Sequence, residues 1–568
     1  MTEKNFYTSD PLLQKLLKRS LPEAFFAYAD EKLTVFGERV AGAIDDRAVH
    51  TDREGQPQLI KYDKMGNEIN EVWVNEGYRE TVKETYETGI VGYVHKEIPE
   101  LGHQGNYVYS YAQGYLLSQA EPGFYCPVTL TMATSYLIDH YADEALRKKY
   151  LPHVIATGDT ELYEGATFLT ERQGGSDVGA NEVSAEAAGS DAYGEVYRIT
   201  GEKYFASNTG MAGVAMVLAR IPGAEEGTKG LSLFLVPWEE NRVENRAKVR
   251  RLKDKLGVRA VPSAEVEFDQ AKGYLVGDPK KGFKYMMEAL NLSRVCNAIA
   301  SLGIMRRGYV EARDYAEDRR AFGGKLTDYP MVRETLANLA SKLEVEMTAI
   351  FELIERFDQV MTKGANPSEE EQAMLRLLIA LLKKESAEQA IHFSHESIEM
   401  HGGNGYIEDF VTPRLLRDAQ VLTVWEGTAN ILGLEVVRLM RKYNIHQTFV
   451  QEMSERLANL DSAAVSLKTP VEQALQKLTS MLEKLVQLDE QTQLLHPKKV
   501  AVQMTKIFEG VVALETISSE DPRSQAVSEV FLQQTFGSDA DLSDAPLRHF
   551  DAIVFEKKSV NKETESVK

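Results

Sequence analysis

The block of residues 166–276 has the texture of β-strands and most constrains the fold of this chain. Its segments GEVYRITGEKYFASN, GVAMVLARI and GLSLFLVPW alternate apolar and polar residues between glycine turns, which is typical of strands with one buried face. Helical patterns flank this block on both sides. That order differs from the β–α alternation of a doubly wound sheet. No GxGxxG follows a predicted strand, so we do not expect a Rossmann dinucleotide site.

The flanking segments predict long buried helices. Cys126–Tyr141 (CPVTLTMATSYLIDHY) is apolar on nearly every face, and a short helix follows it and stops before Gly158. A polar loop at Lys363–Glu371 separates two long helices, and the second of them carries the apolar run MLRLLIALL. Further helices are expected after Pro470, Pro497 and Pro522.

These textures predict four domains. They are an N-terminal helical domain (1–165), a middle β domain (166–276), a second helical domain (277–445) and an extra helical extension (446–568). The tail EKKSVNKETESVK is too highly charged to be buried, so we expect it to be disordered.

Charge and cysteine content exclude several classes of protein. The net charge is −21, from 65 basic and 86 acidic residues, which argues against broad binding to nucleic acid or to anionic membranes. The two cysteines, Cys126 and Cys296, fit a reduced compartment, and no metal-ligand spacing is present, so no metal is expected. The N-terminus lacks an apolar signal core, and no apolar run approaches the length of a membrane span. We therefore expect a cytoplasmic protein without membrane insertion.

One carboxylate stands out in the stretch VWEGTANILGL. Glu426 lies between an aromatic residue and a glycine, just ahead of an apolar helix for which Thr428 is the expected N-cap. Desolvation by Trp425 would favour the protonated acid, whereas the helix N-terminus would favour the anion. Such a carboxylate can act as a general base. The alternative is a first-turn Glu on a solvated face, which for an isolated Glu is favoured by about two to one.

Three other segments contain residues suited to a cofactor, although each is weak evidence alone. In TFLTERQGGSDVGAN (Thr167–Asn181), a Gly-Gly-Ser-Asp turn exposes amides suited to a phosphate or a flavin. In ITGEKYFASN (Ile199–Asn208), an aromatic followed two residues later by a hydroxyl could flank a flavin ring. In YAEDRRAFGGKL, Arg319 at a helix end could pair with a pyrophosphate, or could be an ordinary solvated arginine.

Together with MHGGNGYIEDFVTPRLLRDAQVLTVWEGTAN (Met400–Asn430), whose glycines permit close approach of a ligand, these segments resemble the acyl-CoA dehydrogenase family over residues 85–440. The resemblance implies a mostly α fold with a middle β-barrel domain and a C-terminal four-helix bundle. It also implies FAD between the barrel and the bundle, partly across a subunit interface, and a homo-oligomer that is usually a tetramer of paired dimers.

Within the family, the chain looks most like an AidB-like subgroup that carries a C-terminal helical extension. The motifs CPVTLTMA (Cys126–Ala133), LTERQGGSDV (Leu169–Val178) and WEGTANI support this likeness. In that subgroup the extension has been linked to DNA. Here residues 446–568 have 13 basic and 19 acidic residues, a net charge of −6, so binding to nucleic acid is not expected.

The resemblance assigns roles to particular residues. Glu426 would remove the α-proton of an acyl-CoA thioester, with its own backbone amide and Gly427 beside the thioester oxygen. Relatives that place the base on a bundle helix have it at the position of Ser293, which cannot serve as a base. Arg294 next to it could shape the substrate end or be a buried structural arginine. The implied FAD contacts are Thr170, Gly175, Ser176, Phe205, Ser207, Arg319, Phe322, Gly402, Gly403, Thr428 and Asn430, and the substrate contacts are Ser176, Arg294 and Gly427.

Two positions depart from the family pattern. Glu399 and Pro330 stand where many members have a glutamine that contacts the tail of the flavin. Phe205 replaces the commoner tryptophan and keeps an aromatic face. We expect FAD still to bind, with changed contacts at its adenylate end.

The reaction implied by the resemblance is α,β-desaturation of an acyl-CoA to trans-2-enoyl-CoA, as in fatty acid β-oxidation, with hydride transfer to flavin N5 and an electron-transfer flavoprotein as acceptor. One alternative is an acyl-CoA oxidase that uses O₂. Another is an AidB-like stress or DNA-associated flavoprotein with residual dehydrogenase activity. Nitroalkane oxidation usually requires Asp at the position of Glu426 and is therefore less favoured.

Overall fold

The computed structural model describes residues 5–538 and 542–555, so the disorder expected for the C-terminal tail lies outside the described residues. The chain divides into two compact units, Met1–Gly303 with Met361–Gly364, and Ile304–Val360 with Ala365–Lys568. The second unit holds the helices of both predicted C-terminal domains except the first part of helix α9 (Gly282–Asp318), which belongs to the first unit up to Gly303. The finer division into four domains stays a prediction.

The N-terminal part of the first unit is helical. A small antiparallel hairpin, β1 (Gln58–Tyr62) with β2 (Glu68–Trp73), interrupts these helices and was not expected from the sequence. Helix α6 is buried from Pro122 to Ile138, which confirms the helix predicted from its apolar run. The helices are α1 (Pro11–Ser20), α2 (Glu23–Arg39), α3 (Asp45–Arg53), α4 (Glu76–Glu87), α5 (Tyr107–Ser118), α6 (Pro122–Tyr141) and α7 (Glu144–Val154).

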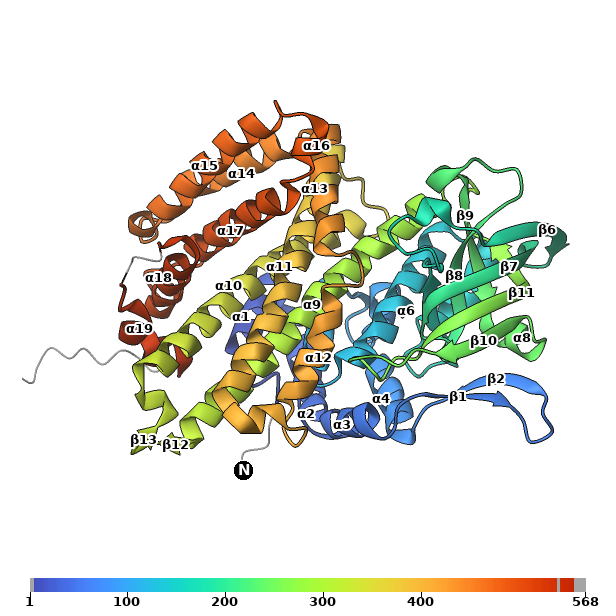
Figure 1. Ribbon diagram of the computed structural model, residues 1–568, viewed down its shortest axis with the longest axis horizontal. Coiled ribbons are helices and arrows are strands. Elements are labelled where there is room, and N and C mark those ends of the chain that lie inside the picture. The colour runs from blue at the N-terminus through green and yellow to red at the C-terminus, as the bar shows by residue number, and fades with distance from the viewer. Residues whose placement is uncertain (1–4, 539–541, 556–568) are drawn as a thin grey trace, which may run out of the picture. The chain divides into compact units, whose positions relative to one another are not determined.

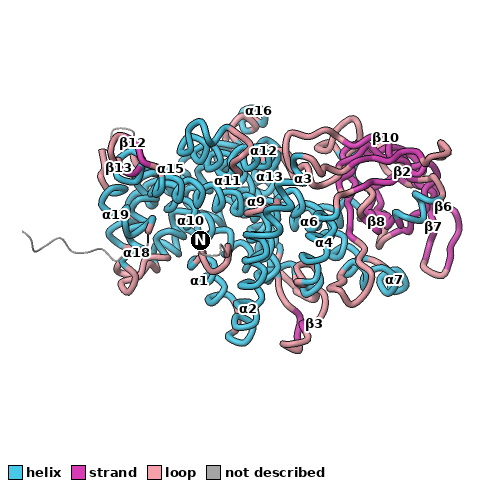
Figure 2. Tube along the Cα trace, turned by 90° about the horizontal axis from the view of Figure 1, so that it is seen from below, coloured by secondary structure: helices cyan, strands magenta, loops and turns pink. Residues whose placement is uncertain are grey.

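The strands that follow close into a small barrel (Figures 1 and 2). Strand β11 pairs with both β7 and β9, β9 pairs with β8, and a parallel bridge between Ser184 and Arg220 joins β8 to β6, which returns to β7. Closure removes the free sheet edges of this ring. The strands are β5 (Glu164–Phe168), β6 (Ser184–Asp191), β7 (Gly194–Ser207), β8 (Ala212–Arg220), β9 (Leu231–Pro237), β10 (Ala247–Leu252) and β11 (Ser263–Leu275).

Long helices dominate the second unit. Helix α10 begins at Pro330, and α11 begins after a capping box in which Ser368 and Glu371 satisfy each other's backbone amides. The loop between them confirms the predicted break. Helices also begin at Pro497 and Pro522, as predicted. The helices are α9 (Gly282–Asp318, shared between the units), α10 (Pro330–Met361), α11 (Glu369–His401), α12 (Thr412–Leu422), α13 (Ala429–Tyr443), α14 (Ile445–Ala458), α15 (Thr469–Leu485), α16 (Glu490–Gln493), α17 (Pro497–Glu515), α18 (Pro522–Phe536) and α19 (Ala545–Val554).

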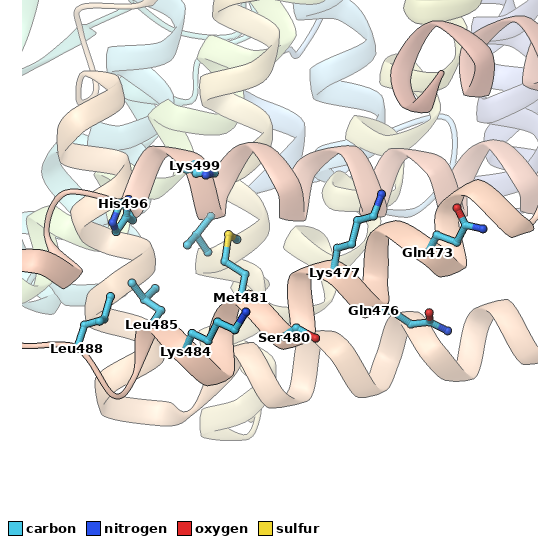
Figure 3. A pocket seen from close by; sticks show the side chains of 11 residues that line it. Gln473, Gln476, Lys477, Ser480, Met481, Lys484, Leu485, Leu488, His496 and Lys499 are labelled. Atoms are coloured by element: carbon cyan, nitrogen blue, oxygen red, sulfur yellow. The ribbon is translucent and has the colours of Figure 1, made fainter. Parts of the chain in front are cut away.

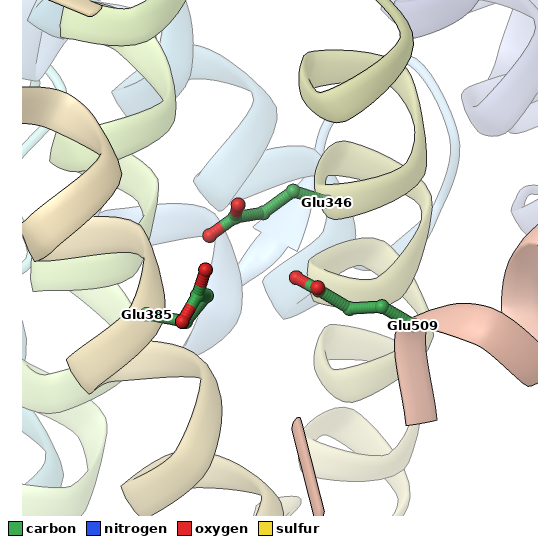
Figure 4. A group of neighbouring side chains, drawn as sticks. All are labelled: Glu346, Glu385 and Glu509. Atoms are coloured by element: carbon green, nitrogen blue, oxygen red, sulfur yellow. The ribbon is translucent and has the colours of Figure 1, made fainter. Parts of the chain in front are cut away.

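A buried ionic cluster joins the extension to the long helices of the second unit (Figure 4). The ammonium of Lys342 lies 3.0 Å from Glu346 and Glu385 and 2.8 Å from Glu509 of α17. Three carboxylates so close together could surround a metal ion, but here an ammonium supplies the cation. Burial raises the pKa of Glu509 to about 7 and that of Glu346 well above its ordinary value. Burial therefore favours the protonated forms of these two carboxyl groups.

None of the described helices is both long enough and apolar enough to cross a lipid bilayer.

Candidate active site

Glu426 lies in a strained loop between α12 and α13. Its φ is 60°, in the left-handed region that an L-residue with a long side chain rarely adopts, and Gly427 follows with a φ of 104°. Such a conformation costs of order 1–3 kcal/mol and persists only where the surroundings impose it. The Glu426 side chain is half-buried and its Oε2 atom is shielded from solvent. The loop thus leaves the carboxylate partly shielded from solvent.

A buried lysine imposes this conformation. Lys383 of α11 is 1% exposed, and its ammonium donates hydrogen bonds of 2.7 Å to the carbonyl of Trp425 and 2.8 Å to that of Gly427. These two carbonyls flank Glu426, so one cation holds the backbone on both sides of the carboxylate. Hydrogen bonds from a charged donor are among the stronger ones in proteins. Lys383 was not predicted as a site residue, although it directly follows the apolar run MLRLLIALL in the sequence.

Exposed polar side chains lie at the start of α13, beside this loop. Thr428 occupies the N-cap position as expected, but its side chain makes no capping hydrogen bond, so the expected hydroxyl cap is wrong. Its backbone is extended (φ −69°, ψ 167°), and the side chain is exposed instead of turned over the first turn. Asn430, in that first turn, is also exposed. The indole N–H of Trp425 is buried and has no hydrogen-bond partner among the described residues, which fits a loop built to meet a ligand.

In the first unit, the barrel presents a second group of predicted residues. Ala206 of β7 is fully buried, so Phe205 and Ser207 on either side point outward from the barrel. The amide of Tyr204 donates a 3.0 Å hydrogen bond to the Thr170 carbonyl, which brings Thr170 beside them. Phe205 is 55% exposed. A large exposed aromatic next to two hydroxyl residues fits a flat, partly polar ligand such as a flavin ring.

A buried ion pair holds the turn that contains Gly175 and Ser176. Glu171 accepts a 2.8 Å hydrogen bond from the ammonium of Lys203, and both residues are buried. Burial lowers the pKa of Lys203, although Glu171 opposes the shift. A Cβ atom at Gly175 would lie 2.6 Å from the hydroxyl of Thr170. Only glycine therefore keeps the Thr170 hydroxyl at its present position, and Ser176 beyond it is exposed.

The remaining FAD residues predicted for the second unit lie around the end of α9. Arg319 is exposed just after α9, and a hairpin follows, formed by β12 (Arg320–Ala321) and β13 (Gly324–Lys325). Phe322 forms the hairpin tip with Gly323, both with positive φ as a type I′ turn requires, and Phe322 is 97% exposed.

Gly402 and Gly403 follow α11 and belong to the same region, because Asn404 donates a 3.1 Å hydrogen bond to the Tyr315 hydroxyl of α9. Gly402 has a φ of 58°, and a Cβ atom at either glycine would meet nothing within 4 Å. The space beside these glycines is therefore open to a ligand or another subunit. Glu399 and Pro330, the two departures from the family pattern, are both exposed.

Arg294 is the remaining candidate. It lies on α9 in the first unit, is 4% exposed, and donates a 3.1 Å hydrogen bond to Asn291. This burial favours a structural arginine, and a role at the substrate end stays a prediction.

Comparison with known proteins decides the family. The chain is 31% identical over 551 residues to acyl-CoA dehydrogenase family member 11 of Caenorhabditis elegans, covering 93% of this chain and 87% of that relative. The chain belongs to the acyl-CoA dehydrogenase family. It is accordingly an FAD-dependent oxidoreductase. Its residues 280–440 match the C-terminal domain of acyl-CoA dehydrogenases, 166–271 the middle domain, and 1–158 the N-terminal domain of the adaptive response protein AidB.

Two further similarities support the AidB-like subgroup and the fold of this acyl-CoA dehydrogenase. The putative acyl-CoA dehydrogenase AidB of Escherichia coli (strain K12) is 28% identical over 451 residues, covering 78% of this chain and 79% of AidB. The crystal structure of Caenorhabditis elegans ACDH-11 in complex with C11-CoA superposes with a TM-score of 0.85 at 29% identity, covering 99% of this chain and 96% of that one. The chain therefore has the acyl-CoA dehydrogenase fold.

Proposed function

We propose that this acyl-CoA dehydrogenase converts a saturated acyl-CoA into its trans-2-enoyl-CoA, with Glu426 as the base that removes the α-proton. The observation that carries the proposal is the strained backbone of Glu426, which a buried lysine holds in place. Strain that the structure over-determines in this way is concentrated at active sites.

The loop performs three tasks in this proposal. It presents the Glu426 carboxylate to the Cα proton of the thioester, and its partial burial limits competition from water. The backbone amide of Glu426 donates to the thioester oxygen, where negative charge develops as the proton leaves. Lys383 fixes the positions of the Glu426 carboxylate and backbone amide relative to each other, because it binds the carbonyls of Trp425 and Gly427.

FAD, when bound, supplies the acceptor for the hydride that leaves Cβ. On the barrel, Thr170 and Ser207 would hold the ring edge by hydrogen bonds, Phe205 would pack against the ring, and Gly175 would leave room for it. The second unit would hold the remainder of the cofactor with Arg319, Phe322, Gly402, Gly403, Thr428 and Asn430. The exposed aromatic, the open glycines and the uncapped start of α13 all suit this assignment.

We infer a medium-chain substrate and a homo-oligomer. The substrate inference rests on likeness to ACDH-11, whose structure holds C11-CoA. The oligomer inference rests on large apolar or aromatic side chains of the second unit that are exposed to solvent in the single chain. Phe322 is 97% exposed, Met331 81% and Tyr406 83%. Large apolar groups gathered on one region of a surface are typical of subunit contacts, and a tetramer is the family's usual assembly.

Electrons would leave through an electron-transfer flavoprotein in a cytoplasmic setting. This acceptor is the one that the family resemblance implies, with O₂ as the alternative. We favour dehydrogenation over the DNA-associated role, because residues 446–568 carry a net charge of −6. The observation that supports the DNA-associated role as an alternative is the likeness of residues 1–158 to the N-terminal domain of AidB.

Product analysis tests this proposal. Purified FAD-loaded protein is incubated with C4 to C16 acyl-CoAs and an artificial electron acceptor, and the CoA products are separated by chromatography. We expect trans-2-enoyl-CoA to form, with a maximum at medium chain length and no hydrogen peroxide when the acceptor is replaced by O₂. Peroxide in proportion to product would establish an oxidase. Absence of any enoyl-CoA, together with salt-sensitive duplex binding, would establish the DNA-associated role.

A further inference from the structure

A groove in the extension is lined by apolar, polar and cationic side chains (Figure 3). It lies between α15 and α17 and has a volume of about 590 Å³, within the range of about 300–1,000 Å³ that small-molecule sites occupy. Met481, Leu485 and Leu488 contribute apolar surface, and Leu488 is 40% exposed. The groove thus offers a hydrophobic surface large enough for an alkyl chain.

Three lysines line the same groove. Lys477 and Lys484 are seven residues apart on α15 and so lie on one face of that helix, while Lys499 comes from α17. All three are exposed, and none has a carboxylate partner within 4 Å in the described part of the chain. Positive charge therefore gathers around an apolar surface without an internal counter-ion.

This arrangement is unusual for the extension, whose other basic side chains mostly pair with carboxylates. Arg456 bonds to Glu352 at 2.9 Å, Lys468 lies 2.9 Å from Glu472, and Arg548 lies 2.8 Å from Glu529. In a chain of net charge −21, three lysines without carboxylate partners at one groove mark a place where an anion is favoured.

A second hollow, in the first unit, shows the contrast. It has a volume of about 400 Å³ and is also lined by cations. There, however, Lys96 pairs with Asp159 at 2.8 Å and Lys148 with Glu144 at 2.5 Å. Its charge is largely neutralised within the protein, so it offers no comparable attraction for an anion.

We propose that the groove between α15 and α17 binds a single-chain anionic amphiphile, namely a fatty carboxylate of medium to long chain. The alkyl chain would lie on Met481, Leu485 and Leu488, and the carboxylate would face the lysines. The apolar side chains in the lining distinguish this occupant from a small anion, which needs no such surface. The net charge of −6 over residues 446–568 disfavours a nucleic acid, which needs a wider cationic surface.

Photolabelling of the full-length FAD-loaded protein tests the proposal without relying on turnover. The probe is dodecanoate carrying a diazirine in its alkyl chain, and labelled peptides are located by mass spectrometry. We expect labelling within residues 473–500, competition by unlabelled dodecanoate, and little competition by 1-dodecanol or inorganic phosphate. Labelling should weaken as NaCl is raised, because exposed charges are screened.

A charge-reversal variant and a matched control locate the determinants. Lys477→Glu/Lys484→Glu/Lys499→Glu should raise the dodecanoate concentration needed for half-labelling at least tenfold. Lys498→Glu, an exposed neighbour on α17 outside the groove, should change it less than twofold. Acyl-CoA turnover should be unchanged in both variants, since none of these lysines lies in the Glu426 loop.

Four results would overturn the proposal. The first is no labelling of residues 473–500, and the second is labelling that survives charge reversal. The third is competition by phosphate or by a DNA duplex as strong as that by dodecanoate. The fourth is a smaller oligomeric mass for the charge-reversed variant, which would show that the groove is a contact between copies of the chain.

Discussion

Replacing Lys383 by methionine tests how the protein holds its base. Methionine keeps much of the side-chain volume but removes the donor that reaches the carbonyls of Trp425 and Gly427 at 2.7 and 2.8 Å. A hydrogen bond to a charged group contributes about 1.5–3 kcal/mol, and the cost of burying the ammonium offsets part of the two bonds. We expect a net loss of about 2 kcal/mol in the preference for the observed loop.

That loss has a kinetic consequence. The left-handed backbone of Glu426 already costs of order 1–3 kcal/mol, so the released loop relaxes and the carboxylate leaves its position. At about 1.4 kcal/mol per factor of ten, 2 kcal/mol corresponds to roughly a 30-fold slower reaction. The assay is the rate of flavin reduction in a single anaerobic turnover, which isolates this step from reoxidation. Bound FAD should be unchanged.

Lys384→Met is the matched control. Lys384 is 7% exposed on the same helix and pairs with Glu388 at 2.7 Å, away from the loop carbonyls. It should lower stability while leaving flavin reduction within about threefold of wild type. The reasoning fails if Lys383→Met reduces flavin as fast as wild type, or if Lys384→Met slows it equally.

Three further substitutions test other parts of the account. Phe205→Ala should keep the free energy of unfolding within about 0.5 kcal/mol of the wild-type value, because the ring is 55% exposed. It should weaken the retention of FAD during gel filtration, and full retention would show that Phe205 does not contact the flavin. Phe322→Ser should lower the oligomeric mass in light scattering, and an unchanged mass would contradict the inferred contact. Burial raises the pKa of Glu509 from 4.5 to about 7, so at intermediate pH the folded state keeps a proton that the unfolded chain has lost. The free energy of unfolding should therefore fall as the pH rises from about 4.5 to 7, by no more than about 3 kcal/mol. Glu509→Gln should flatten that dependence in urea titrations, and an unchanged slope would place the titration elsewhere.

Local patterns were sufficient to predict several elements. The apolar run of α6, the polar loop between α10 and α11, and the prolines at the starts of α17 and α18 are signals carried by neighbouring residues. The hairpin β1–β2 was not anticipated, because its strands are short and neither QLIKY nor EINEVW alternates strictly between apolar and polar residues, so the strand signal is weak.

The contacts that support the site were beyond such patterns. Lys383 and Gly427 are 44 residues apart, Lys203 and Glu171 are 32 apart, and Lys342 and Glu509 are 167 apart. A lysine is usually exposed, so its sequence neighbours alone do not mark it as buried. Thr428 shows a related limit. Its residue type predicted a cap, and its backbone (φ −69°, ψ 167°) resembles that of the capping Ser368 (φ −63°, ψ 162°), yet its side chain does not make the bond.

The central claim is that Glu426 is the base of an acyl-CoA dehydrogenase. Its most direct test is an anaerobic titration of the FAD-loaded protein and of Glu426→Gln with saturated acyl-CoAs, while the flavin absorbance is recorded. We predict that a medium-chain acyl-CoA bleaches the wild-type flavin, and that Glu426→Gln binds FAD equally but bleaches at least 100-fold more slowly, as loss of a general base implies at about 10²–10⁴-fold. Equal bleaching by both proteins would show that another residue removes the proton, and no bleaching by any acyl-CoA would contradict the proposed activity.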